Sequence, residues 1–202
     1  MKEVAVILHN IRSLHNVGSV FRTADAAGVS RIYLTGITPA PVDRFGNLRP
    51  QFAKVSLGAE KFVAWEKRRM AGPLIKKLKS DGCAIFAVEQ NKKSVPYYRA
   101  RPFDTTPVRG PERPLRASRR QGKNNSKVAL IFGNEVNGLP PKILKLADKV
   151  LEVPMRGAMV RQAHHPRHAG RGKESLNVST TFGIVVFGLL YPSCGKNFAA
   201  LG

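Results

Sequence analysis

The first 36 residues contain the pattern that most restricts the fold, two apolar strands separated by a helix. Residues 4–8 (VAVIL) form an unbroken apolar run rich in β-branched side chains, and residues 31–36 (RIYLTG) repeat the pattern. Continuous runs of this length are typical of strands that are buried on both faces of a parallel sheet.

The segment between these two strands predicts a helix. Val17, Val20 and Phe21 recur at helical spacing, Asn16 is well placed as an N-cap, and Gly28 as a stop. A strand–helix–strand unit of this kind implies a parallel sheet with a right-handed crossover. The loop after the first strand lies at the edge where open α/β sheets usually bind ligands.

Further strands and helices alternate along the rest of the chain. Apolar strands are predicted at 83–89 and 127–133, with a short amphipathic basic helix at 74–79. A turn over 134–138, a helix opening at 140–141, a short strand at 149–153 and a closing apolar helix at 179–190 follow. We therefore predict a single α/β domain, a mostly parallel sheet flanked by helices, spanning all 202 residues.

Three stretches do not fit this alternation. Residues 38–51 are rich in proline and predict a surface loop that carries Arg44 and Arg49. Residues 99–123 and 158–172 lack apolar periodicity and are rich in basic residues, proline, glycine or histidine, so we expect irregular basic insertions there.

The charge of the chain predicts a polyanionic partner. Lys and Arg number 34 against 13 Asp and Glu, a net charge of +21, which favours nucleic acid over an anionic membrane surface. Two cysteines exclude a disulfide framework, and Cys83 lies in an apolar run, so we expect a core thiol and a cytoplasmic location. No apolar run approaches the length of about 20 residues that crosses a bilayer, so no membrane association is expected.

A metal site is not expected. His164, His165 and His168 are close in sequence, but no cysteine or carboxylate joins them at ligand spacing. Pro166 interrupts any helix that would place the three imidazoles on one face.

Three ordered motifs resemble those of a known family. Residues 16–24 (NVGSVFRTA), 132–138 (FGNEVNG) and 175–179 (SLNVS) look like the motifs of SpoU/TrmH-like RNA 2′-O-ribose methyltransferases in the SPOUT superfamily. Joining 151–157 (LEVPMRG) directly to 173–179 (KESLNVS) gives an uninterrupted family-like loop. We therefore expect residues 158–172 to bulge outward and to leave Met155 and Leu176 close across a shared pocket.

The resemblance implies a deep trefoil knot at the C-terminus, a homodimer, and S-adenosylmethionine as cofactor. A knot is a rare exception to the rule against threaded chains. The cofactor would be held largely by main-chain groups of three segments, namely Ile131, Phe132, Gly133 and Asn134; Val153, Pro154 and Met155; and Ser175, Leu176, Asn177 and Val178.

Carried over by position, the motifs also imply the catalytic residues Arg22, Asn16, Glu135, Ser175 and Asn177. Methyl transfer from a sulfonium is an in-line displacement without a metal, so positioning of the 2′-hydroxyl should dominate. Because a guanidinium stays protonated, we expect Arg22 to stabilise the developing alkoxide or to anchor phosphate rather than to act as a base. Plain structural readings remain open: a solvated Arg22, an exposed turn carboxylate at Glu135, and a helix cap at Ser175 or Asn177.

The resemblance implies an RNA substrate, tRNA ahead of ribosomal RNA. Two alternatives remain. One is a SPOUT base methyltransferase. The other is an RNA-binding protein that keeps the fold and has weak or no activity, because residues 158–172 interrupt the cofactor loop.

Overall fold

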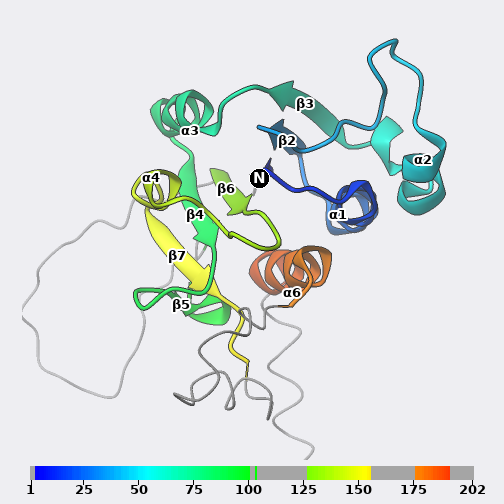
Figure 1. Ribbon diagram of the computed structural model, residues 1–202. Coiled ribbons are helices and arrows are strands. Elements are labelled where there is room, and N and C mark those ends of the chain that lie inside the picture. The colour runs from blue at the N-terminus through cyan, green and yellow to red at the C-terminus, as the bar shows by residue number, and fades with distance from the viewer. Residues whose placement is uncertain (1–2, 101–102, 104–126, 156–175, 192–202) are drawn as a thin grey trace, which may run out of the picture.

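A parallel sheet forms the centre of the computed structural model, which describes residues 3–100, 103, 127–155 and 176–191 (Figure 1). Within these residues the sheet has seven strands in the order β3-β2-β1-β6-β4-β7-β5, and each neighbouring pair is parallel. The strands are β1 (Glu3–His9), β2 (Arg31–Thr35), β3 (Ala64–Arg68), β4 (Ala84–Val88), β5 (Val95–Pro96), β6 (Lys127–Phe132) and β7 (Lys149–Glu152). The predicted α/β class with a mostly parallel sheet is confirmed.

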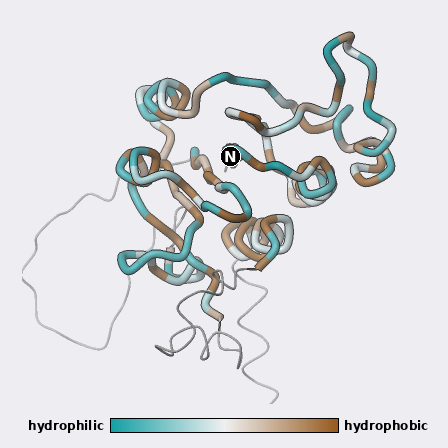
Figure 2. Tube along the Cα trace, viewed as in Figure 1, coloured by the Kyte–Doolittle hydropathy of each residue, from teal (hydrophilic) through white to brown (hydrophobic). Residues whose placement is uncertain are grey.

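Helices cover both faces of the sheet. They are α1 (Leu14–Ala27), α2 (Pro50–Ser56), α3 (Ala71–Ser80), α4 (Pro141–Leu144) and α6 (Val178–Leu190), with 3-10 turns η1 (Ala59–Lys61) and η2 (Tyr97–Arg99). Figure 1 shows α1 and α6 side by side on one face, and α3 and α4 on the other. Figure 2 shows hydrophobic residues gathered on the central strands and where α1 and α6 meet them.

Strand β1 explains why the predicted apolar runs are continuous. Val6 and Leu8 pack into the core beneath α1 and α6, while Ala5 and Ile7 pack into the second core beneath α3 and α4. Because successive side chains of a strand point to opposite faces, a strand covered by helices on both sides needs an apolar residue at every position.

The start of α1 differs from the prediction. Ser13 is the N-cap, and its Oγ accepts a hydrogen bond of 3.2 Å from the backbone N–H of Asn16. The prediction that Asn16 caps the helix is therefore wrong, whereas Gly28 ends it at φ 73° as expected. Because Ser13 caps the first turn of α1, the side chain of Asn16 is not needed as a cap and is available for other contacts.

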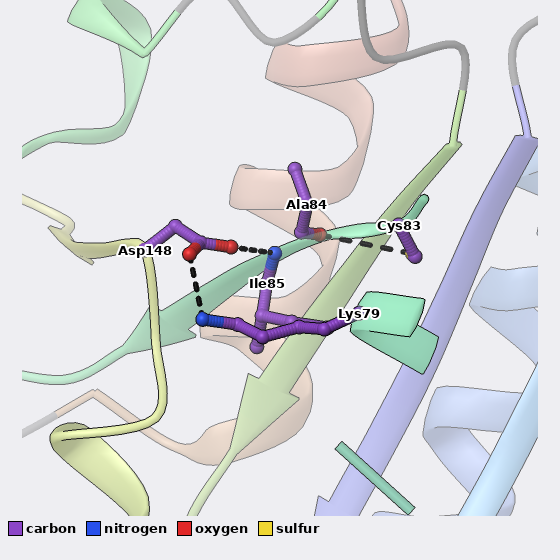
Figure 3. A network of polar contacts seen from close by, with 5 residues as sticks. All are labelled: Lys79, Cys83, Ala84, Ile85 and Asp148. Atoms are coloured by element: carbon purple, nitrogen blue, oxygen red, sulfur yellow. Dashed lines mark hydrogen bonds and ion pairs between the residues drawn. The ribbon is translucent and has the colours of Figure 1, made fainter. Parts of the chain in front are cut away.

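Asp148 fixes β7 beside β4 (Figure 3). One carboxylate oxygen accepts from the backbone N–H of Ile85 at 2.8 Å, and the other from Lys79 Nζ at 2.7 Å. The backbone N–H of Asp148 in turn donates to the carbonyl of Ile85 at 2.7 Å. Cys83, next to this network, is buried, and its burial raises the thiol pKa to about 11. The predicted core position of Cys83 is confirmed.

Parts of the prediction fall outside the described residues. Residues 156–175, which join β7 to α6, are among them, so the trefoil knot stays a prediction. Most of the predicted insertions, 104–123 and 158–172, are also outside. At the start of the first one, Ala100 is buried and Phe103 packs against the core.

Of the helices in the described part of the chain, none has the length and apolar character needed to cross a membrane.

Candidate active site

A cleft lies where the carboxyl ends of β4, β6 and β7 meet the start of α6. The open space within it amounts to about 740 Å³, which includes solvent at the mouth of the cleft. The position is the one that parallel α/β sheets use for ligands. The lining comprises Val88, Glu89, Gln90, Phe132, Gly133, Asn134, Glu135, Val136, Gly138, Glu152, Val153, Met155, Leu176, Val178 and Thr181.

The turn after β6 is held in a fixed shape. Asn134 Oδ1 accepts from the backbone N–H groups of Val136 and Asn137 at 2.9 and 3.0 Å, and its carbonyl accepts from Gly138 at 2.9 Å. Asn134 Nδ2 donates to the carbonyl of Asn10 at 2.8 Å, which ties the turn to the loop after β1. These bonds fix the direction in which Glu135 leaves the turn.

Glu135 connects the second motif to the first. Its carboxylate accepts from the backbone N–H groups of Arg12 and Ser13 at 3.1 and 3.3 Å, and from Asn16 Nδ2 at 3.0 Å. Asn16 Oδ1 in turn accepts from Asn177 Nδ2 at 3.1 Å. Asn16 is thus joined in one hydrogen-bonded chain to Glu135, which lies 119 positions later in the sequence, and to Asn177, which lies 161 positions later.

Asn177 has two roles at once. It is the N-cap of α6, where its Oδ1 accepts from the backbone N–H of Ser179 at 2.8 Å, and it also donates to Asn16. Asn177 can therefore be both the helix cap and a residue of the candidate site.

The hydrogen bonds keep Glu135 ionised. Partial burial alone raises the pKa of the carboxyl, but the hydrogen bonds from the turn backbone, Asn16, Arg12 and Ser13 outweigh burial, and the pKa lies below its ordinary value. Glu135 is thus a charged acceptor rather than a proton donor near neutral pH.

Glu89 and Gln90 also line the cleft, and sequence reasoning missed both. Glu89 Oε2 accepts from the backbone N–H of Leu139 at 2.8 Å. A Cβ placed on Gly138, at φ 63°, would lie 2.2 Å from that oxygen, so the glycine permits the close approach. Gln90 Nε2 lies 3.7 Å from Met155 Sδ. Their place at the end of the predicted strand 83–89 was the available signal.

The predicted cofactor residues divide into three groups. Phe132, Gly133, Asn134, Val153, Met155, Leu176 and Val178 line the cleft. Met155 and Leu176 share this lining, as expected for the two halves of the split loop. Ile131 is fully buried in the core beneath α3 and α4, and Pro154 and Asn177 are not in the lining of the cleft among the described residues. Ser175 lies outside the described residues.

Arg22 is not brought into this cleft by its own chain. It is exposed on α1 and borders an open groove together with His15, Lys54 and Phe187. Among the described residues no hydrogen bond or ion pair fixes its guanidinium, so the side chain is available for a ligand from outside.

The described residues contain no group of three His, Cys, Asp or Glu side chains arranged to hold a metal ion. His164, His165 and His168 lie outside that part of the chain.

Comparisons with known proteins place these motifs in context. Residues 3–160 match the SpoU rRNA Methylase family. The tRNA (guanosine(18)-2′-O)-methyltransferase of Aquifex aeolicus is 26% identical over 190 residues, which cover 92% of this chain and 68% of that protein. The 23S rRNA (guanosine-2′-O-)-methyltransferase RlmB of Neisseria meningitidis is 25% identical over 181 residues, 90% of this chain and 55% of that one.

Solved structures agree in fold. The AdoMet-bound rRNA methyltransferase from Sinorhizobium meliloti superposes with a TM-score of 0.68 at 23% identity, over 93% of this chain and 55% of that chain. The TrmH/SpoU tRNA modifying enzyme of A. aeolicus gives 0.67 at 22% identity, over 99% and 80%. This chain thus spans only part of the length of these relatives.

Proposed function

Because this chain belongs to the SpoU rRNA Methylase family, we propose that it transfers a methyl group from S-adenosylmethionine to the 2′-hydroxyl of a ribose in RNA. The observation that carries the proposal is the meeting of three distant motifs. Asn16, Glu135 and Asn177 form one hydrogen-bonded chain beside a cleft at the carboxyl ends of the strands.

The lining of the cleft suits the chemical groups of S-adenosylmethionine. Phe132, Val153 and Leu176 supply apolar surface suited to the adenine ring, and the main chain at Gly133 lies open to the cleft. Carboxylates in the lining suit the ribose hydroxyls, the sulfonium and the ammonium group. When bound, S-adenosylmethionine supplies an electrophilic methyl group.

The residues around the cleft position the RNA ribose. Glu135 holds the N–H groups of Arg12 and Ser13 and the amide of Asn16, so the first motif is fixed against the second. Asn177 fixes the third motif to Asn16. Such a preorganised frame serves the proximity and orientation that in-line displacement requires. We assign the chain Asn16–Glu135–Asn177 this positioning role.

Arg22 acts from the open groove beside α1. Its exposed guanidinium suits an RNA phosphate, which it binds without giving up a proton. To stabilise the developing 2′-alkoxide it must face the cleft of a second copy, as in the homodimer that the family resemblance implies. The proton then leaves to a phosphate or to water. A homodimer, which the family resemblance implies, accounts for the exposed Phe187, which lines this groove, and for the exposed Tyr191 just after α6, whose ring lies 5.8 Å from that of Phe187.

The RNA substrate is tRNA, with ribosomal RNA as the second candidate. The relatives reported above include enzymes named for each of the two substrates. The net charge of +21 favours either polyanion.

Isothermal titration with S-adenosylmethionine tests the cofactor step. The wild-type protein should bind, and Leu176→Arg, which places a charged side chain at the cleft, should not. Leu57→Arg is the matched control, because Leu57 is 65% exposed and lies outside the cleft lining. No detectable binding to the folded wild-type protein would refute the enzyme proposal and favour an RNA-binding protein without activity.

A further inference from the structure

A loop formed by residues 38–49, here named the arm, is not explained by the cleft. It leaves the carboxyl end of β2 and returns at the start of α2, and Figure 1 shows it projecting from the body beside α2. At its tip Phe45 is 73% exposed. The guanidinium carbon of Arg44 lies 4.6 Å from the centre of the Phe45 ring. Singly exposed apolar side chains are common on protein surfaces. This ring differs in that it is paired with a cation at the tip of a projecting turn.

The arm is held in one shape by its own hydrogen bonds. Asp43 Oδ1 accepts from the backbone N–H groups of Phe45 and Asn47 at 2.8 and 2.9 Å, and the N–H of Asp43 donates to the carbonyl of Asn47 at 2.9 Å. Val42 and Leu48 form a bridge across the arm. The carboxylate of Asp43 is thus directed into the arm, and Arg44 and Phe45 form its outer surface.

The base of the arm is fixed to the body. Lys67 Nζ donates to the carbonyls of Gly36, at 2.7 Å, and Thr38. Thr38 is fully buried, and its Oγ1 donates to the carbonyl of Leu8 at 2.9 Å. The arm is therefore a projection anchored at both its root and its turn.

Asn10 joins the base of the arm to the candidate active site. Its Oδ1 accepts from the backbone N–H of Ile37 at 3.1 Å, and its carbonyl accepts from Asn134 Nδ2 at 2.8 Å. Asn134 shapes the turn that carries Glu135. The arm thus rises from the same edge of the sheet as the cleft.

We propose that the tip of the arm binds RNA, with Phe45 stacking on an unpaired base and Arg44 contacting a neighbouring phosphate. Exposed aromatic rings that stack bases, beside cations that track the backbone, are the usual means of holding single-stranded RNA. An Arg packed against the ring keeps both groups oriented. The proposal rests on the proposed function in that the RNA bound is the substrate.

The test measures RNA affinity by fluorescence anisotropy, with a labelled tRNA transcript, a 12-nucleotide single strand and a fully paired RNA duplex. Phe45→Ala should weaken binding of the tRNA and the single strand by about 5- to 150-fold, which corresponds to roughly 1–3 kcal/mol for a base stack. Binding of the duplex should change little, and Phe45→Trp should restore affinity. Phe62→Ala is the matched control, since Phe62 is 79% exposed and lies outside the arm.

The charge contact is tested separately. Arg44→Gln should reduce the slope of log affinity against log salt by about 0.7 for the single strand. Lys76→Gln, an exposed charge on α3, is the control and tests whether any lost cation has the same effect.

The outcomes distinguish this proposal from the proposed function. S-adenosylmethionine binding should be unchanged in all arm variants. Phe45-dependent RNA binding by a protein that transfers no methyl group would support the arm and reject the enzyme. Methyl transfer with equal RNA affinity for wild type and Phe45→Ala would overturn the arm. A wild type without RNA affinity, or a Phe45→Ala variant altered only in its oligomeric mass, would overturn it as well.

Discussion

Replacing Asn16 by Asp should destabilise the fold at neutral pH and do so less as the pH falls. The substitution keeps the shape of the side chain and preserves an oxygen that accepts from Asn177. It also replaces the amide that donates to Glu135 at 3.0 Å by a second carboxylate oxygen. Asn16 is only 8% exposed, so water screens the new contact poorly.

The expected loss of unfolding free energy is about 2–4 kcal/mol at pH 7. Two unit charges about 4 Å apart repel by about 4 kcal/mol at an effective dielectric constant of about 20. The lost hydrogen bond to a charged group adds about 1.5–3 kcal/mol. Relaxation of the half-buried Glu135, and uptake of one proton by the carboxyl pair, reduce the total.

The pH dependence follows from linkage. The pair should hold a proton in the folded variant at pH values where both carboxyls are ionised in the unfolded chain, so folding takes up a proton. The deficit should therefore shrink between pH 7 and pH 5, by at most about 1.4 kcal/mol per pH unit.

Urea unfolding followed by circular dichroism and by the fluorescence of Trp65, the only tryptophan, measures the effect. Asn137→Asp is the matched control, because it adds the same charge at an exposed position of the turn that carries Glu135. Equal stability of the two variants at pH 7, or a deficit at Asn16→Asp that does not change with pH, would contradict the assigned contact between Asn16 and Glu135.

Three further predictions concern neighbouring groups. The lowered pKa of Glu135 stabilises the fold at pH values above the ordinary carboxyl pKa of 4.5, and this contribution is lost as the pH falls through the folded-state pKa. Glu135→Gln should therefore make stability against urea depend less on pH in the acid range. Gly138→Ala should lower the free energy of unfolding, measured with heat or urea, by about 1–3 kcal/mol and weaken cofactor binding, because the new Cβ would meet the carboxylate of Glu89. The control Gly82→Ala, at φ 79° with open space around the new Cβ, should lower it less and leave cofactor binding intact. Cys83, with a pKa of about 11, should react slowly with iodoacetamide at pH 8 in the native protein and rapidly in urea, as mass spectrometry of its peptide will show.

The strands and helices that could be predicted are those whose own residues show an apolar run or a helical spacing. The strands β1, β4 and β6 lie inside the sheet, and their apolar runs follow from burial on both faces. Strand β2, beside the edge strand β3, buries Ile32 and Leu34 but leaves Arg31 exposed. Strand β3 (AWEKR) was missed because it lies at the sheet edge, where charged residues replace the apolar run.

The motif residues of the candidate site were predictable from the local sequence, but the contacts between them were not. Asn16, Glu135 and Asn177 belong to motifs that the sequence displays, but their hydrogen bonds depend on the tertiary fold. The N-cap was misassigned because Ser13 and Asn16 are both good capping residues and only the backbone decides between them. Glu89 was missed because its partner is the main chain of Leu139, so its place at the end of the predicted strand 83–89 was the one sequence signal for it.

Mapping the methylated atom tests the central claim most directly. The full chain is incubated with methyl-labelled S-adenosylmethionine and with total tRNA or ribosomal RNA, and the labelled nucleoside is identified after digestion by mass spectrometry. The proposed function predicts a 2′-O-methylated ribose, whose 3′ phosphodiester also resists alkaline cleavage, and no labelling by Leu176→Arg. A label on a base, or no label from a folded protein that binds the cofactor, would contradict it.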